Sequence, residues 1–363
     1  MPIETLHPLS RWAGANFNGF PHVHYGVSGT AMLFDALRQS GRRTVVLPAF
    51  ICHSLSDMAL CAGKRVVHID VDRNALLMNR DQLEQCLAEH GDSESLLLVD
   101  HPFGYPCSAI AEIRAKHPDL LIVEDCVRAL GSQINGEPVG RSGDWILLSL
   151  YKTIPGNDHG AIMLTRSRYE IRSGPAPRAT LSQRLSTLGP ARWVHDRLKR
   201  LRPIPPASGR DLEPSPWAPL YGVPNRLVLK RFWRELDSLE EGVARRCQAA
   251  REIQTGLEDI KTIRFVRPGT ACRTSGYFLS FTVTGPGLRD RLLAAMHRKG
   301  LFLFRTWQAV PAYFRCFRDT FPFGSSESTF LAQHICHVPV IRFLGLAHRE
   351  RLVQELRKFF QQV

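Results

Sequence analysis

Short apolar runs alternate with segments of helical spacing through the first 165 residues. Six apolar runs are typical of buried strands: residues 43–50, 65–72, 95–101, 119–125, 144–150 and 160–165. Three segments, one before and two between these runs, carry apolar side chains at every third or fourth position: residues 30–41, 81–91 and 108–117. Strands that alternate with helices of about ten residues predict β-α-β units. The fold class is therefore α/β, with a mostly parallel central sheet and flanking helices.

The pattern changes after residue 165. Residues 166–220 are rich in proline and arginine, which predicts an insertion or crossover between a first part, 1–165, and a second part, 221–363. We expect the second part to contain one long helix over about 225–257 and a smaller C-terminal α+β domain. No stretch approaches the ~20 apolar residues of a membrane span, and the N-terminus shows no secretory signal.

Cysteine usage and charge refine this picture. The nine cysteines form no C-x-x-C pair, which predicts reduced thiols in the cytoplasm and no metal site. The net charge is +13, and most of it lies between Arg166 and Arg210. There, residues 181–202 alternate leucines with basic residues. This segment either packs against the protein with its arginines in solvent, or holds a polyanion such as a nucleotide-linked sugar or an anionic, peripheral membrane surface. Nucleic acid is not expected, because aromatic residues are sparse there.

Three groups of polar residues stand where a parallel sheet binds ligands, beyond the carboxyl ends of its strands. Gly29 and Thr30 open a predicted helix, whose free N–H groups suit a phosphate. Asp125 ends one strand, and Ser149 and Lys152 follow another. Taken singly, these residues could be helix caps or an exposed loop lysine. Together they match pyridoxal 5'-phosphate (PLP), which needs a phosphate site, a carboxylate for its ring nitrogen and a lysine for its aldehyde.

Longer stretches carry a family resemblance. They read SGTAMLFDAL, VVLPAFICHS, AGKRVVHIDVD, HPFG, IVEDCVRALGSQINGEPVGRSGDWILLSLYK, HGAIMLT and ICHVPV. With them the chain resembles the DegT/DnrJ/EryC1/StrS family of PLP-dependent aminotransferases, of fold type I, as a divergent member. The resemblance implies that Lys152 forms the Schiff base with PLP and that Asp125 pairs with the ring nitrogen. It implies further that Gly29, Thr30 and Ser149 bind the phosphate.

The chain departs from the family pattern around the cofactor. Arg128 stands where members have glutamine or histidine, and it could favour the anionic form of the phenolic oxygen. Cys52 occupies the position of the aromatic residue that stacks on the ring, so His53 or Phe50 is expected to replace it. Four further residues are candidates for substrate contact: Tyr151, Asn157, Arg305 and Trp307. An arginine such as Arg305 could bind a carboxylate, or could be a surface residue at a strand end.

The resemblance implies transfer of an amino group from an amino acid, with glutamate as the expected donor, to a keto-sugar or related metabolite. Such a reaction serves cell-surface polysaccharide or secondary-metabolite biosynthesis. A homodimer is expected, with residues 156–160 and the region around Asn225 near the interface. Two alternatives remain open: another PLP reaction (elimination, decarboxylation or C–C bond formation), or a non-catalytic scaffold.

Overall fold

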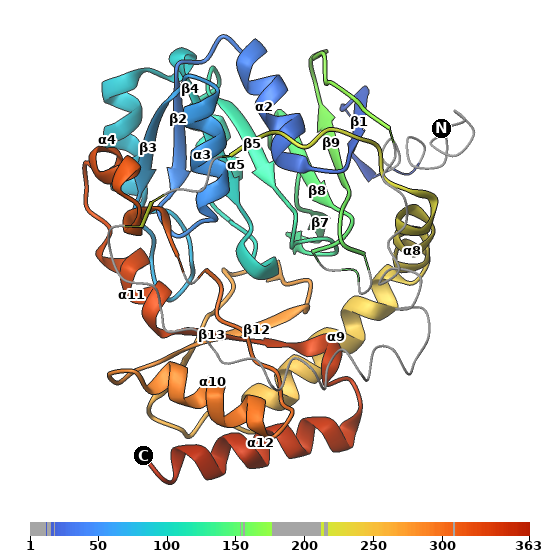
Figure 1. Ribbon diagram of the computed structural model, residues 1–363, viewed down its shortest axis with the longest axis vertical. Coiled ribbons are helices and arrows are strands. Elements are labelled where there is room, and N and C mark those ends of the chain that lie inside the picture. Colours follow the sequence, from blue (N-terminus) through green and yellow to red (C-terminus); the bar gives the residue numbers. More distant parts are fainter. Residues whose placement is uncertain are drawn as a thin grey trace.

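The computed structural model describes residues 12, 16–17, 19–152, 154, 157–175, 212–213, 217–307 and 309–363. The basic segment 181–202 lies outside the described residues. A large α/β part and a smaller α+β part face each other, joined by two consecutive helices (Figure 1). Within the described chain, no helix combines the length and the apolar character that crossing a membrane requires.

Seven strands form the central sheet, in the order β1-β9-β8-β5-β4-β2-β3. Their bounds are β1 His22–Gly26, β9 Ala161–Thr165, β8 Trp145–Ser149, β5 Leu121–Asp125, β4 Ser95–Asp100, β2 Thr44–Pro48 and β3 Arg65–Ile69. The five strands from β8 to β3 run parallel, and β9 and β1 add an antiparallel edge. The predicted mostly parallel sheet is confirmed, and all six predicted strands are present. The sequence pattern did not predict β1.

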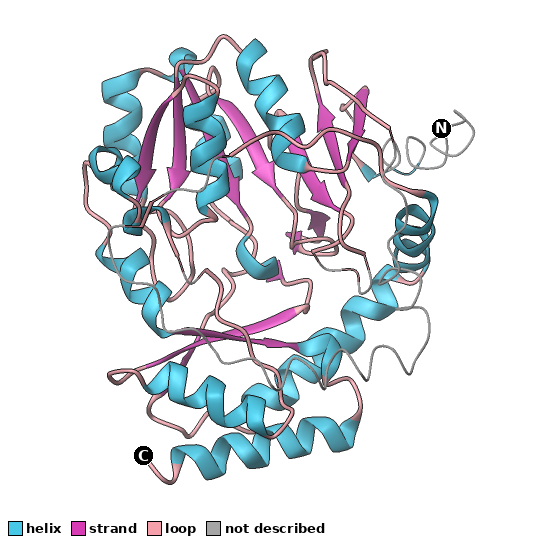
Figure 2. Cartoon of the chain, in the orientation of Figure 1, coloured by secondary structure: helices cyan, strands magenta, loops and turns pink. Residues whose placement is uncertain are grey.

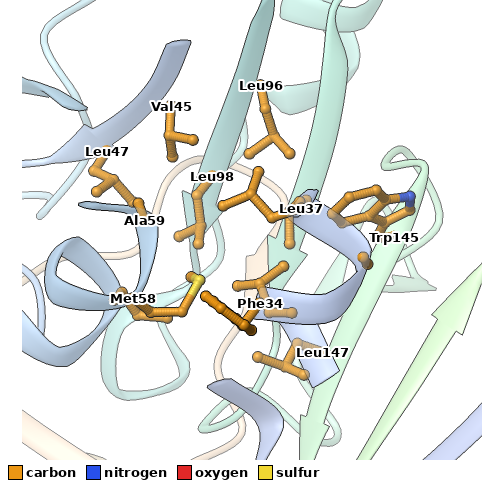
Figure 3. Packing of buried hydrophobic residues seen from close by; sticks show 14 of the residues in the cluster. Phe34, Leu37, Val45, Leu47, Met58, Ala59, Leu96, Leu98, Trp145 and Leu147 are labelled. Atoms are coloured by element: carbon orange, nitrogen blue, oxygen red, sulfur yellow. The ribbon is translucent and has the colours of Figure 1, made fainter. Parts of the chain in front are cut away.

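Helices cover both faces of this sheet (Figure 2). On one face lie α2 (Gly29–Gln39) and α3 (His53–Cys61), and on the other lie α4 (Arg80–His90) and α5 (Ile110–Lys116). Alternate strand residues point to opposite faces, so each face supplies its own apolar layer. Figure 3 shows the first layer, in which Phe34 and Leu37 of α2 meet side chains of the strands. The helices predicted at 30–41, 81–91 and 108–117 are confirmed, whereas α3 was not predicted.

The predicted single helix over 225–257 is wrong. The structure has two helices, α8 (Arg226–Asp237) and α9 (Leu239–Thr255), separated at Ser238. The backbone of Ser238 leaves the helical region (φ −119°, ψ 21°), and its hydroxyl donates to the carbonyl of Arg234. A serine hydroxyl that competes for helix carbonyls in this way favours a helix end.

The smaller part contains an antiparallel sheet in the order β10-β12-β13, with bounds β10 Ile263–Phe265, β12 Phe278–Val283 and β13 Ile335–Pro339. Its helices are α10 (Leu288–Arg298), α11 (Ser326–His334) and α12 (Leu346–Phe360). The α+β character of this part was predicted. A third sheet connects the two parts, with bounds β6 Gln133–Ile134, β7 Glu137–Pro138 and β11 Cys272–Arg273.

The carboxyl ends of the central strands face the smaller part (Figure 1). The loop after β4 packs tightly against the smaller part: Gly104 has φ +90°, and a Cβ there would lie 2.1 Å from Ser275 Oγ. Farther along, the Tyr105 hydroxyl accepts the N–H of Ser280 on β12 at 2.9 Å. Glycine at 104 therefore lets the two parts meet beside the strand ends.

Candidate functional site

The register of the sheet brings the start of α2 to the end of β8. Gly26, Ala161 and Ser149 are paired in one row across β1, β9 and β8. Ser28, the N-cap of α2, comes two residues after Gly26. A Cβ added at Gly29 would lie 3.0 Å from Leu147 Cδ1, so the first turn of α2 packs directly on β8.

This junction offers several hydrogen-bond donors to an anion. The N–H groups of Gly29 and Thr30 lie in the first turn of α2, where no intrahelical acceptor exists. Ser28 Oγ lies 2.9 Å from Thr30 Oγ1 and accepts the N–H of Ala31 at 3.4 Å. A phosphate at a helix N-terminus uses this combination of free N–H groups and hydroxyls. Ser28 was not predicted, although a serine directly before Gly-Thr at a helix start is a recognisable N-cap signal.

Ser149 shapes the turn that carries Lys152. Its Oγ accepts the N–H groups of Tyr151 at 3.2 Å and Lys152 at 3.0 Å. The hydroxyl proton of Ser149 then remains available for a ligand. Lys152 is exposed, and its Nζ lies 5.2 Å from the centroid of the Tyr151 ring. The spacing of three residues between Ser149 and Lys152 is thus the span of one hydrogen-bonded turn.

Asp125 is a buried carboxylate at the end of β5. Burial raises its pKa, while the N–H of Val127 and the positive charges of Lys152 and Arg128 oppose the rise. Within the described chain, the side chain accepts one hydrogen bond, from Val127 N at 3.0 Å. Burial disfavours the negatively charged form of Asp125, and a cationic ring nitrogen placed against this carboxylate would stabilise that form. Asp125 therefore fits the role predicted for it.

Asp100 is a second carboxylate at the same edge, and it was not predicted. It ends β4 directly opposite Asp125 in the β4–β5 register. Its Oδ2 is shielded from solvent and has no hydrogen-bond partner in the described part of the chain. Burial and the negative charge of Asp125 raise the pKa of Asp100 well above its ordinary value, while Arg128 lowers it. In the sequence, Asp100 is only a polar residue near the end of the apolar run 95–101.

Arg128 lies between two aromatic rings beside these carboxylates. Its Cζ is 5.1 Å from the ring centroid of Phe103 and 5.4 Å from that of Trp307. The Trp307 ring in turn lies 5.2 Å from Phe50. Burial lowers the pKa of Arg128, and its attraction to Asp100 opposes this. The structure thus brings the predicted residues Arg128 and Trp307 together.

Phe50 and His53 are the two candidates for the residue that stacks on the cofactor ring. Phe50 is buried among Phe103 and Trp307. His53 begins α3, where its ring lies 4.5 Å from that of Phe314 and its Nε2 lies 3.8 Å from Asp57. The choice between Phe50 and His53 stays a prediction.

Two predicted substrate residues make contacts elsewhere. Arg305 donates from Nη1 to Asp290 Oδ1 at 2.9 Å, and Asp290 belongs to α10 of the smaller part. Asn157 donates from Nδ2 to the carbonyls of Leu150 at 2.6 Å and Val228 at 3.1 Å. Asn157 therefore anchors the loop after Lys152 to α8, and the candidate site is built without these two side chains.

Glu124 supports the site from the other face of β5. It accepts backbone N–H groups at Gly140, Ser142 and Gly143, at 2.8, 2.8 and 2.5 Å. His101 Nδ1 accepts the N–H of Cys107, so His101 Nε2 is the nitrogen that donates to Glu124 Oε2 at 3.0 Å. These bonds explain the Glu-Asp and G-x-x-V-G spacing in the sequence, because one carboxylate fixes the loop that leads into β8.

Comparison with known proteins relates the chain to one family. Residues 13–168 match the model of the DegT/DnrJ/EryC1/StrS aminotransferase family. Over 152 residues the chain is 30% identical to UDP-N-acetyl-3-dehydro-alpha-D-glucosamine 3-aminotransferase of Acidithiobacillus ferrooxidans, covering 40% of this chain and 39% of the relative. It is 28% identical to GDP-perosamine synthase of Escherichia coli O157:H7, covering 39% and 41%. The match thus spans about two-fifths of the length of these curated relatives.

Solved structures extend the likeness to the whole fold. A DegT DnrJ EryC1 StrS aminotransferase from Brucella abortus superposes with a TM-score of 0.72 at 18% identity, covering 98% of this chain and 90% of that one. The sugar aminotransferase CalS13 from Micromonospora echinospora gives 0.70 at 20% identity, covering 98% and 91%. At these identities the superpositions concern the fold. The resemblance read from the sequence is thereby confirmed: over residues 13–168 this chain is similar to the DegT/DnrJ/EryC1/StrS aminotransferase family.

Proposed function

We propose that this chain is a PLP-dependent aminotransferase that moves an amino group from an amino acid, glutamate in the first instance, to a keto-sugar. One observation carries the proposal. The first turn of α2, Ser149, Lys152 and the under-bonded carboxylate Asp125 meet at one edge of the sheet. Each of these groups matches a different part of PLP.

The residues present suggest how the cofactor would be held. Its phosphate would take the donors of Gly29 and Thr30 with the hydroxyls of Ser28 and Ser149. Asp125 would keep a proton on the ring nitrogen by opposite-charge attraction. Arg128, a cation near Asp125, would favour an anionic phenolic oxygen.

The chemistry follows from these positions. When bound, PLP withdraws electrons from the substrate carbon that carries the amino group. Lys152 Nζ is a base in its neutral form and an acid in its protonated form, so it can take up a proton from that carbon and return it. The rings of Phe103 and Trp307 lie against the Arg128 guanidinium and reduce its contact with water.

The substrate class rests on the relatives. The two curated proteins quoted above are named for amino-sugar chemistry on nucleotide-linked sugars. We therefore propose a keto-sugar acceptor, within cell-surface polysaccharide or secondary-metabolite biosynthesis. A nucleotide diphosphate on the sugar would also give the basic segment 181–202 a polyanion to bind.

The test is a half-reaction followed by mapping. The purified protein with PLP should be yellow, and L-glutamate should convert the bound cofactor into its pyridoxamine form with release of 2-oxoglutarate. Borohydride reduction before glutamate is added should fix the cofactor on Lys152. Pyridoxamine formation separates transamination from elimination, decarboxylation and C–C bond formation, which return the cofactor as PLP. A protein that never binds PLP would instead be the non-catalytic scaffold.

Assembly and location belong to the same proposal. We propose a cytoplasmic homodimer in which the loop around Asn157 and the start of α8 lie near the partner. Asn157 already fixes this loop against α8 within one protomer. Sedimentation of the PLP-loaded protein checks the dimer, and full activity of a monomer would overturn it. Flotation with anionic vesicles, compared with a protein in which Arg192, Arg197, Lys199 and Arg200 are alanine, checks peripheral membrane contact.

A further inference from the structure

Arg128 is a cation of the candidate site whose hydrogen-bond donors the fold does not use. Its backbone is fixed, because its carbonyl accepts the hydroxyl of Ser275 at 3.3 Å. Its guanidinium, however, makes no hydrogen bond and no ion pair among the residues that the structure describes. A guanidinium carries five N–H donors in a planar fork. The side chain is only half-buried, so these donors remain accessible to a ligand.

Two aromatic rings hold the guanidinium in place. Its Cζ lies 5.1 Å from the ring centroid of Phe103, in the loop after β4, and 5.4 Å from that of Trp307, in the smaller part. The two centroids are 5.2 Å apart. An arginine that stacks on aromatic rings keeps its planar fork in one orientation, so it loses less conformational freedom when the fork binds an anion. The donors of Arg128 are therefore oriented before a ligand arrives.

The rings are themselves supported by His337 of β13. The carbonyl of Thr306, next to Trp307, can only accept, so His337 Nε2 donates to it, at 2.9 Å. His337 Nδ1 then accepts the hydroxyl of Ser280 at 2.8 Å. Burial lowers the pKa of His337 to about 3, which keeps the ring neutral and this bonding pattern intact near neutral pH. The His337 ring also lies 3.9 Å from that of Phe103.

The other arginine expected to bind substrate has a partner within the fold. Arg305 is buried, and its Nη1 donates to Asp290 Oδ1 at 2.9 Å. The same oxygen accepts Arg289 Nε at 2.6 Å, so two arginines share this carboxylate. Of the two sequence-predicted arginines, Arg128 is therefore the one whose guanidinium lies at the candidate site with its donors unused.

The two carboxylates near Arg128 do not occupy it either. No hydrogen bond or ion pair joins the guanidinium to Asp100 or Asp125 in the described part of the chain. Asp125 is the proposed partner of the ring nitrogen. Burial raises the pKa of Asp100 well above its ordinary value, which favours its neutral form. The positive charge of Arg128 is thus available to an anionic group of the substrate.

We propose that Arg128 binds the α-carboxylate of the amino-acid donor through the N–H groups of its guanidinium. This inference rests on the proposed function and deepens it. Lys152 exchanges a proton with the carbon that carries the amino group, and in an amino acid the α-carboxylate is bonded to that same carbon. The phosphates of a nucleotide-linked sugar are several bonds away from the reacting carbon. An influence of the Arg128 charge on the phenolic oxygen uses no N–H donor, so the two roles are compatible.

The test measures binding and does not depend on turnover. Two stable conjugates are made by borohydride reduction of PLP with L-glutamate or with its α-amide, L-isoglutamine, and each is titrated into the cofactor-free protein. The conjugates differ only in the α-carboxylate. The natural protein should bind the glutamate conjugate about 10- to 100-fold more tightly, as charge-assisted hydrogen bonds predict. Arg128→Gln should bind the two conjugates with nearly equal affinity.

Two further variants sharpen the result. Arg128→Lys keeps the charge but loses the planar fork, so it should retain part of the preference, and it replaces the glutamine variant if that variant does not fold. Arg305→Gln is the matched control and should retain the full preference, because Arg305 is bonded to Asp290. The inference is overturned if Arg128→Gln keeps the natural preference, or if Arg305→Gln is the variant that loses it.

The remaining outcomes separate this inference from the proposed function. A role of Arg128 toward the phenolic oxygen alone would weaken both conjugates equally, which would also overturn the inference. The same conclusion follows if the natural protein binds PLP and both conjugates without discriminating between them. If the natural protein binds neither PLP nor either conjugate, the proposed function itself fails, which is a separate result.

Discussion

Glu124 and Asp125 are consecutive residues of β5, yet their surroundings differ sharply. Glu124 accepts three backbone N–H groups and the Nε2–H of His101. Asp125, on the opposite face, accepts one N–H, from Val127, in the described part of the chain. Both are buried. The carboxylate of Glu124 has its hydrogen bonds satisfied within the fold, whereas that of Asp125 can accept further hydrogen bonds.

The difference separates scaffold from site. A buried carboxylate with four hydrogen bonds fixes the backbone around it and has no capacity left for a ligand. A buried carboxylate with one hydrogen bond carries a desolvation cost that a bound cation can offset. We therefore expect substitutions at the two positions to affect different properties, stability for Glu124 and function for Asp125.

The largest effect is expected from the replacement of Lys152, which belongs to the site. Lys152→Ala removes both the covalent attachment and the proton-transferring amine, so turnover should fall by about 10⁴-fold or more. Steady-state assays with glutamate and a keto-sugar check this. Lys116, an exposed residue of α5, supplies the control variant Lys116→Ala. Turnover retained in the Lys152 variant would remove Lys152 from the site.

Glu124 should show the opposite signature. In the natural protein, N–H donors face both carboxylate oxygens of Glu124. Glu124→Gln replaces one of these oxygens by an amide NH₂, so that buried N–H groups are left without an acceptor. The free energy of unfolding should fall by about 3–5 kcal/mol. Denaturant unfolding measures it. The variant that does fold should bind PLP as the natural protein does, and a selective loss of PLP with unchanged stability would contradict the scaffold role.

Asp125→Asn should lower turnover by about a hundredfold, which corresponds to about 3 kcal/mol in the transition state. The phosphate contacts do not involve Asp125, so PLP should stay bound. Turnover assays together with equilibrium dialysis of PLP separate the two effects. Unchanged turnover would reduce Asp125 to a helix cap for the turn at Val127.

Part of the candidate site could be predicted from the sequence, and part could not. Asp125, Ser149 and Lys152 could be predicted because each follows an apolar strand, and strand ends of a parallel sheet meet at one edge. Asp100 also ends an apolar strand, but its position opposite Asp125 depends on the register between β4 and β5, which the pattern of apolar residues does not fix. Long-range pairing also decides the place of Arg305, since its contact with Asp290 on α10 has no signal along the chain. The break at Ser238 is a local hydroxyl contact within an otherwise helical pattern.

A smaller effect is expected at the phosphate end of the site. Ser149→Ala removes a hydroxyl that can donate to the phosphate and accepts the N–H groups of Tyr151 and Lys152. Loss of one such contact corresponds to about 1–1.5 kcal/mol, so PLP affinity should fall about tenfold. Titration of the apoprotein with PLP measures it. Ser40→Ala, at the far end of α2, should leave the affinity unchanged.

The smallest effect concerns the stability of the protein without cofactor. Burial raises the folded-state pKa of Asp125 above its ordinary value. The folded protein therefore binds more protons than the unfolded chain between these two values, and stability falls as pH rises through the raised pKa. A single group can contribute a slope of at most about 1.4 kcal/mol per pH unit in that window. Asp125→Asn has no charge to bury, so it should flatten this part of the pH profile and leave the cofactor-free protein more stable at the upper end. Thermal unfolding across pH, with and without PLP, checks the sign. A variant that is less stable than the natural protein throughout the window would show that Asp125, like Glu124, contributes mainly to the scaffold.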